Sequence, residues 1–217
     1  MEKIENPSRE RILARIKSAL DTPTQLASSP PAGPAFAPIP DPLHRFQEEC
    51  VFNKAECLVT PNMEASAVAV SEILTSVPAG NVFVQDAPSL RRMAAIMNSG
   101  RDLHWSTEGP PGETSRATIT LAESLVAATG SVFVSAACGG RKASIVAPVH
   151  IVVATLSQLV PDLATAFQKM STRGTITQNS MLCLITGPSR TGDIEKILVL
   201  GAHGPQRLVI VLAMQDD

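Results

Sequence analysis

The residues best suited to chemistry lie near the C-terminus, where a polar stretch interrupts apolar sequence. The apolar run Met181–Ile185 predicts a strand, and the loop after it contains Gly187, Ser189, Arg190 and Thr191. Apolar residues at helical spacing follow, so the loop is predicted to open a helix. They are Ile194, Ile197, Leu198 and Leu200. Because backbone N–H groups at a helix N-terminus are unpaired and partly positive, we expect a carboxylate or phosphate to bind there. The alternative is a helix end whose hydroxyls cap only its own backbone.

A second cationic loop follows the predicted strand Ser131–Ser135. Its members are Gly139, Gly140, Arg141 and Lys142. In open α/β sheets ligands bind beyond the carboxyl ends of the strands, so the two cationic loops are expected to converge on one anion. Cys138 directly precedes the second loop, and nearby cations lower the pKa of a thiol. The sequence shows no base for this thiol, so a nucleophilic role for Cys138 is the weaker interpretation.

Three further places carry polar groups that could face a ligand. Thr129 and Gly130 form either a tight turn or a second backbone cradle, with Glu123 as an acid or base beside it. His203 lies in a Gly- and Pro-containing turn that could aim it into a cleft. His150 begins a predicted strand, at the rim opposite to the expected site, which favours a structural histidine. The ligand-binding residues predicted from the sequence are Thr129, Gly130, Gly187, Ser189, Arg190, Thr191 and His203.

Local spacing assigns no reaction and no metal. The sequence contains no close carboxylate pair, no Ser-His-Asp order and no nucleotide-binding glycine motif, so the catalytic residues stay unknown. The four cysteines are widely spread and lack the spacing of zinc or iron–sulfur ligands. Cys57 and Cys183 lie in apolar strands and are interpreted as small hydrophobic residues. The sequence therefore predicts no metal site in this chain.

Composition narrows the classes of partner. The chain has 217 residues, of which 44% are hydrophobic, and a net charge of −2. Without a broad basic face, nucleic-acid binding lacks its usual electrostatic source. No apolar run approaches the roughly 20 residues that cross a bilayer, and residues 1–21 are too charged for a signal peptide. We expect a soluble cytoplasmic protein that binds neither nucleic acid nor membrane.

Three segments are predicted along the chain. Residues 1–21 form a helical arm whose amphipathic helix spans Pro7–Leu20, and residues 22–42 form a proline-rich extended linker. The apolar side of this helix either folds back on the chain's own core or docks on a second subunit or a partner. Residues 43–217 form an α/β domain.

The α/β domain is predicted from repeated alternation of apolar strands and helical patterns. Continuous apolar strands are typical of a parallel sheet covered on both faces. Helices are expected at 43–53, 62–76, 88–99, 121–125 and 161–170, and strands at 57–60, 81–85, 104–105, 131–135, 149–155, 181–185 and 208–212. The predicted fold is a three-layer α/β/α arrangement with a largely parallel sheet.

Five motifs, in this order, resemble the LUD domain family, and within it lactate utilization protein C. They are Ala128–Ser131, Pro148–Val153, Val160–Leu163, Thr186–Glu195 and Gly201–Pro205. The resemblance implies a fold like that of glucosamine-6-phosphate deaminase, ribose-5-phosphate isomerase and the CoA transferases. It also implies a role in oxidising L-lactate to pyruvate alongside iron–sulfur subunits. Because this chain lacks closely spaced cysteines, any iron–sulfur cluster is expected on a partner subunit and no cofactor on this chain.

The sequence departs from the family pattern at two places. Ala128 stands where relatives commonly carry an acidic residue, and the glycine-rich loop carries Cys138 with Arg141 and Lys142. From the resemblance and the Gly187–Thr191 loop together, we expect a subunit of a lactate-oxidising complex with a small-anion site. A homo-oligomer is compatible with this. The alternative is a stand-alone enzyme or sensor that binds a phosphorylated or carboxylated small molecule.

Overall fold

The computed structural model describes residues 7–21, 37–97, 99–192, 198–200 and 204–215. The chain divides into two compact units, Met1–Ala35 and Phe36–Asp217, at a boundary inside the proline-rich segment. Among its described residues, the first unit contains the helix α1 (Pro7–Leu20), with the predicted bounds. In the described residues, no helix is long and apolar enough to cross a membrane.

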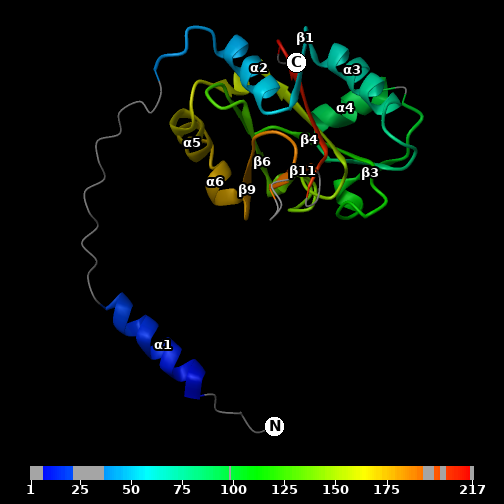
Figure 1. Ribbon diagram of the computed structural model, residues 1–217. Helices are drawn as coiled ribbons and strands as arrows, with labels where there is room; N and C mark the ends of the chain where they lie inside the picture. Colours follow the sequence, from blue (N-terminus) through cyan, green and yellow to red (C-terminus); the bar gives the residue numbers. More distant parts are fainter. Residues whose placement is uncertain (1–6, 22–36, 98, 193–197, 201–203, 216–217) are drawn as a thin grey trace. The chain divides into compact units, whose positions relative to one another are not determined.

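The second unit is built on a six-stranded sheet in the order β1-β12-β7-β4-β2-β3 (Figure 1). Every neighbouring pair in this sheet is parallel, which confirms the predicted α/β fold with a largely parallel sheet. The strands are β1 (Glu56–Thr60), β2 (Val82–Val84), β3 (Leu103–Trp105), β4 (Ala117–Leu121), β7 (Val149–Thr155) and β12 (Arg207–Ala213).

Two helices, α3 (Met63–Thr75) and α4 (Pro88–Ile96), cover one face of this sheet. The side chain of Asn62 caps α3 by accepting a hydrogen bond from the Ala65 N–H, at 2.9 Å. Buried apolar residues then recur along one side of α3 and pack on apolar side chains of the parallel strands. Because the strands follow one another in parallel, both helices begin at the carboxyl edge of the sheet.

A second, four-stranded sheet with the helix α2 (Pro42–Phe52) covers the other face. Its order is β8-β5-β6-β9, and it pairs antiparallel except between β5 and β8. The strands are β5 (Ser124–Val126), β6 (Ser131–Ser135), β8 (Leu159–Val160) and β9 (Leu182–Ile185). The outer face of this sheet packs on α5 (Leu163–Thr172), which is followed by α6 (Thr175–Gln178) (Figure 1). The second sheet thus forms a layer that the three-layer prediction did not include.

The predicted membership of β6 and β9 in the parallel sheet is wrong. All five residues of β6 are buried, since one side faces the central sheet and the other faces α5. A strand buried on both sides has the continuous apolar sequence that is also typical of a central parallel strand. Periodicity alone therefore could not separate the two sheets.

Two predicted helices are also wrong. The segment 121–125 contains the end of β4 and the start of β5, and Glu123 N–H donates to the Phe133 carbonyl on β6. After Ser189, β10 (Arg190–Gly192) pairs antiparallel with β11 (Leu198–Leu200) instead of opening a helix. Short apolar segments fit either period, and cross-strand pairing decided both cases.

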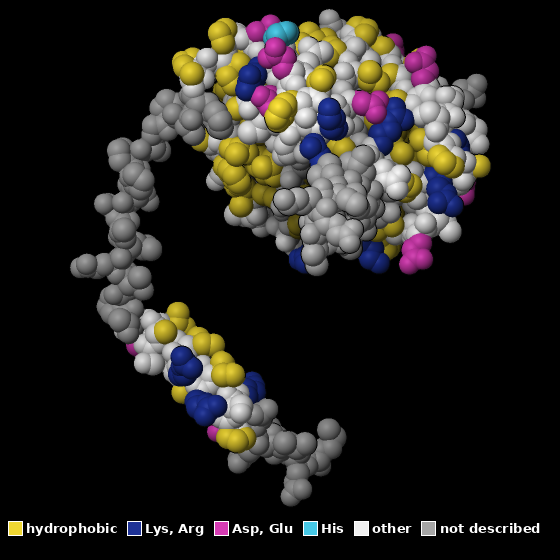
Figure 2. All heavy atoms as spheres, viewed as in Figure 1, with side chains coloured by type: hydrophobic (Ala, Val, Ile, Leu, Met, Phe, Trp, Pro, Cys, Tyr) yellow, Lys and Arg dark blue, Asp and Glu magenta, His cyan; other side chains and the backbone are white. Residues whose placement is uncertain are grey.

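The charged side chains are mixed in sign over the visible surface. On the face of the second unit shown in Figure 2, Lys and Arg side chains are interspersed with Asp and Glu. Such a pattern lacks the single-sign field that steers nucleic acids.

Three short 3₁₀ helices complete the described structure. Two of them, η1 (Ser106–Glu108) and η3 (Leu156–Gln158), follow β3 and β7 at the carboxyl edge of the central sheet. The third, η2 (Ala136–Cys138), follows β6 and begins the loop that contains Gly139 and Gly140.

Candidate functional site

Four of the residues predicted to bind a ligand gather at the C-terminal end of α2. The Arg190 guanidinium donates a hydrogen bond to the carbonyl oxygen of Asn53, the residue that follows α2. The Asn53 side-chain amide donates to the Thr129 carbonyl oxygen at 3.1 Å. Gly187 (φ +91°) is so close to this helix end that a Cβ atom there would collide with the Asn53 carbonyl oxygen. The loops thus close on the helix backbone.

Gly130 makes the same kind of close approach. It has a φ of +61°, and a Cβ atom placed there would lie 2.7 Å from the Glu49 carbonyl carbon. The neighbouring hydroxyls pair with one another: Ser131 Oγ lies 2.8 Å from Thr129 Oγ1 and 2.6 Å from Thr186 Oγ1. The Thr-Gly turn therefore serves the packing of the second sheet on α2.

In this arrangement Arg190 donates a hydrogen bond at the C-terminal end of α2. Carbonyl groups at the end of a helix lack intrahelical partners and carry partial negative charge, and a guanidinium satisfies both needs. The helix N-terminus on which the predicted anion site depended is replaced by β10 and β11. Anion binding by this loop stays a prediction, now without its helix.

The other predicted residues of this region are less informative. Ser189 is partly buried, and its N–H donates to the Pro205 carbonyl oxygen at 2.8 Å. Thr191 lies in β10, and its side chain is outside the described structure. His203 lies outside the described residues.

The predicted convergence of the two cationic loops is wrong. Gly139 contacts Phe83 of β2 and Ser106 beyond β3, whereas Arg190 contacts the segment that leads from α2 into β1. These strands lie toward opposite edges of the central sheet. Arg141 and Lys142 are exposed.

The structure also counts against the weaker interpretation of Cys138, that of a nucleophile activated by the cations after it. Its thiol is buried, and this burial raises its pKa to about 11. Because a thiol reacts as its thiolate, this environment suppresses its nucleophilicity at neutral pH.

The side chains of Glu123 and His150 form hydrogen bonds within the fold. A Glu123 carboxylate oxygen accepts a hydrogen bond from the Ser135 hydroxyl. His150 is fully buried in β7, and its Nε2 atom lies 2.9 Å from Thr120 Oγ1. Burial lowers the His150 pKa to about 4, so the ring is neutral at physiological pH. The structural interpretation of His150 is confirmed.

A cavity of about 370 Å³ opens at the carboxyl edge of the central sheet, which is where α/β sheets bind ligands. The ends of β4 and β7 form its floor, through Leu121 and Val153–Thr155. Arg92 of α4 and Arg173, the C-cap of α5, bring two positive charges to its lining. Both guanidinium groups belong to exposed residues, so the cavity is open to a ligand from solvent.

The N-terminus of α4 and two serine hydroxyls add hydrogen-bond donors to this lining. Ser89 occupies the first turn of α4, and no side chain caps that helix end, so its first backbone N–H groups can donate to an anion. Ser157 and Gln158 complete the rim. The Gln158 side chain accepts from the Thr155 N–H at 2.8 Å and thereby fixes the loop after β7. Chemically the cavity suits a small carboxylate or phosphate.

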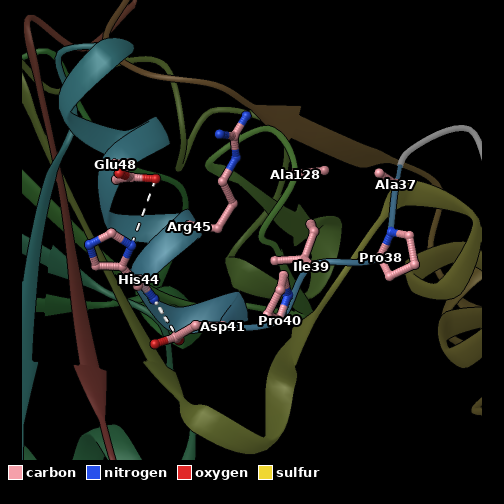
Figure 3. Close-up of a pocket in the computed structure, with 9 residues that line it drawn as sticks. All are labelled: Ala37, Pro38, Ile39, Pro40, Asp41, His44, Arg45, Glu48 and Ala128. Carbon is pink, nitrogen blue, oxygen red and sulfur yellow. Dashed lines mark hydrogen bonds and ion pairs between the residues drawn. The ribbon is translucent and has the colours of Figure 1, made fainter.

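A larger cavity, of about 530 Å³, lies beside α2 (Figure 3). Pro38, Ile39, Pro40 and Ala128 give it an apolar lining, and one side of α2 forms its wall. The charged groups on that wall already have partners. Asp41 caps α2, His44 lies 3.8 Å from Glu48, and Arg45 pairs with Glu49. This cavity therefore offers less to an anion than the one at the sheet edge.

Sequence analysis did not identify the residues that line the edge cavity. Arg92 lies within a helical pattern, and Arg173 lies 81 positions later at the end of another helix. Neither arginine belongs to a local motif. The one available signal was the rule that the carboxyl ends of parallel strands, and the loops after them, form the site.

Comparison with known proteins finds relatives of the C-terminal half of the chain. Residues 112–213, from just before β4 to the end of β12, match the LUD domain family. Lactate utilization protein C from Macrococcus caseolyticus is 35% identical over 102 residues, which is 46% of this chain and 43% of that protein. The Bacillus subtilis protein of the same name is 29% identical over 126 residues, 50% of this chain and 52% of that protein. The match thus spans about half, or less, of these relatives' length.

A solved structure supports the fold. A DUF162 family protein from Deinococcus radiodurans superposes with a TM-score of 0.61, covering 79% of this chain and 96% of that one, at 21% identity. The resemblance to the LUD family is confirmed by the sequence matches of the C-terminal half. The likeness to the deaminase, isomerase and CoA-transferase folds stays a prediction.

Proposed function

Because residues 112–213 of this chain form a domain of the LUD family, we propose that the protein is a lactate utilization protein C-like subunit. In this role it supports the oxidation of L-lactate to pyruvate together with iron–sulfur partner subunits in the cytoplasm. The observation that carries this proposal is the sequence similarity to two proteins named lactate utilization protein C.

The proposed reaction requires an electron acceptor. Oxidation of L-lactate to pyruvate removes two electrons and two protons, from C2–H and from the C2 hydroxyl. In this proposal the electrons pass to iron–sulfur clusters on the partner subunits, and this chain contributes binding and orientation.

The edge cavity is the proposed small-anion site. A guanidinium binds a carboxylate through charge-assisted hydrogen bonds, and Arg173 can supply them at the rim. The N-terminal amides of α4 and the hydroxyl of Ser89 can donate hydrogen bonds to the same carboxylate. Lactate and pyruvate both carry the carboxylate that such a site recognises.

A second candidate function rests on the same cavity. A stand-alone enzyme or sensor could bind a phosphorylated or carboxylated molecule there without any lactate-oxidising complex. The cavity, at about 370 Å³, has room for ligands larger than lactate, which is the observation that favours this alternative.

Two measurements test the subunit proposal. A strain that lacks this protein should fail to oxidise L-lactate, and the tagged full-length chain should co-purify with iron–sulfur proteins from cells grown on L-lactate. Normal lactate oxidation in the deletion strain would contradict the proposal.

Ligand binding is tested separately on the purified chain. Titration calorimetry with L-lactate, pyruvate and inorganic phosphate should show binding that Arg173→Gln weakens about ten- to a hundredfold, the loss of one charge-assisted contact. Arg141→Gln is the matched control, because it removes an exposed positive charge from the loop after β6, which does not line the edge cavity. Equal effects of the two substitutions would exclude a specific site at Arg173. Tight binding of phosphate alone, with normal lactate oxidation in the deletion strain, would favour the stand-alone function.

A further inference from the structure

Cys50 and Cys57 are brought together by the way α2 ends. Lys54 adopts a left-handed conformation with a φ of +63°, the Ala55 N–H donates to the Cys50 carbonyl at 2.8 Å, and the Lys54 N–H donates to the Val51 carbonyl at 3.1 Å. These two crossed hydrogen bonds define a Schellman motif, which reverses the chain. Cys57 therefore returns in β1 alongside the last turn of α2, where both cysteines pack in the same apolar cluster.

The two thiols have different surroundings. Cys50 is fully buried, and its sulfur lies 3.8 Å from the Gly130 carbonyl oxygen. Cys57 is only partly buried, so a small reagent can reach it from solvent.

The two cysteines shift each other's pKa in opposite directions. The neighbouring Cys50 thiol lowers the pKa of Cys57, because a nearby S–H group stabilises the thiolate. The neighbouring Cys57 sulfur and burial both raise the pKa of Cys50, which keeps its proton. The pair thus combines an accessible cysteine that favours the thiolate with a buried thiol in the same apolar cluster, the arrangement of a peroxide-reactive cysteine and a resolving cysteine.

We propose that Cys50 and Cys57 form a peroxide-reactive dithiol that closes to a disulfide between the end of α2 and β1. The Cys57 thiolate attacks one oxygen of hydrogen peroxide, the O–O bond breaks, and the departing hydroxide takes up a proton to leave as water. Cys57 then carries a sulfenic acid. The Cys50 sulfur attacks the Cys57 sulfur, the S–O bond breaks, and hydroxide leaves with the proton of Cys50 as a second water. Two thiols are oxidised by two electrons, and one peroxide is reduced to two waters.

The other two cysteines provide internal controls. Burial raises the pKa of both Cys138 and Cys183, so their thiols stay protonated at neutral pH. Cys183 matches Cys57 in being only partly buried. A difference in reactivity between Cys57 and Cys183 therefore reports the effect of the Cys50 partner rather than exposure alone.

The test uses the reduced full-length protein treated with a small excess of hydrogen peroxide at neutral pH. The protein should lose two free thiols and the mass of two hydrogen atoms. Trypsin cuts after Lys54, between the two cysteines, so the product should contain the peptides of Cys50 and Cys57 joined to each other. Cys183→Ser should behave like the unaltered protein.

Single substitutions separate the two steps. Cys50→Ser should stop at the Cys57 sulfenic acid, which dimedone traps, whereas Cys57→Ser should form neither product. Retention of four free thiols in the unaltered protein, or oxidation of Cys138 or Cys183 before Cys57, would overturn the proposal. The peptide map of the unaltered protein decides the matter even if a variant fails to fold.

Discussion

His150 and Thr120 form a buried polar pair between neighbouring parallel strands of the central sheet. The Nε2 atom of the histidine lies 2.9 Å from the threonine Oγ1 atom, and both residues are fully buried. In the described structure, the other ring nitrogen of His150 has no hydrogen-bond partner. An imidazolium at this place would be a buried charge without a counter-charge on its hydrogen-bond partner, so the fold accepts only the neutral ring.

We expect stability to fall in acid because of this histidine. Burial lowers its pKa from the ordinary 6.5 to about 4 in the folded chain, so the unfolded chain binds the proton more readily. The contribution is fully present above pH 6.5 and is lost as the pH falls to 4, by about 3 kcal/mol in total. His150→Gln removes this titration. Urea unfolding at pH 7.5 and pH 5 should show about 2 kcal/mol less pH dependence in the variant, and equal pH dependence would contradict the expectation.

Gly130→Ala should destabilise the protein more than Gly140→Ala. Both glycines have positive φ, which costs a residue with a side chain roughly 1–2 kcal/mol. A Cβ atom at Gly130 would also press on the end of α2, whereas Gly140 has open space. The additional clash should cost about 1–3 kcal/mol. Thermal or urea unfolding measures the difference between the two variants, and equal losses would mean that α2 can move away.

Arg190→Ala should leave anion binding unchanged and lower the free energy of unfolding by ~1 kcal/mol, the net value of its hydrogen bond to Asn53. The physical reason is that the guanidinium already donates to the end of α2, whereas the proposed anion site is the edge cavity. Calorimetry with phosphate and lactate checks this, with Arg173→Gln measured in parallel. A large loss of affinity in Arg190→Ala alone would place the anion at the loop after β9.

Asp162→Ala should cost about 1 kcal/mol of stability through loss of a helix cap. The Asp162 carboxylate accepts a hydrogen bond from the Thr165 N–H at 2.7 Å, which also lowers the pKa of this carboxyl group. Asp162→Asn keeps an acceptor oxygen and should recover most of the loss. Urea unfolding of the three proteins at pH 7 compares them, and an equally destabilised asparagine variant would show that the negative charge matters more than the hydrogen bond.

Elements whose sequence signal is local lie where the sequence predicts them. Helices α2, α3 and α4 lie close to their predicted positions because their start signals are local: Asp41, Asn62 and Pro88. Strands β7 and β6 have their predicted bounds because their apolar runs are uninterrupted. The segment after Ser189 was predicted wrongly, since a few apolar residues between polar ones fit a hairpin as well as a helix.

By itself, the sequence determined which segments are strands and which are helices over most of the α/β unit, and the resemblance of residues 112–213 to the LUD domain family. Only the tertiary structure decided that β6 belongs to a second sheet, that Arg190 ends on Asn53, and that Arg92 and Arg173 line one cavity. The physical reason is that the spacing of apolar residues and the capping of helices depend on residues close together in the chain. Sheet membership and the grouping of charges depend instead on contacts between segments far apart in sequence.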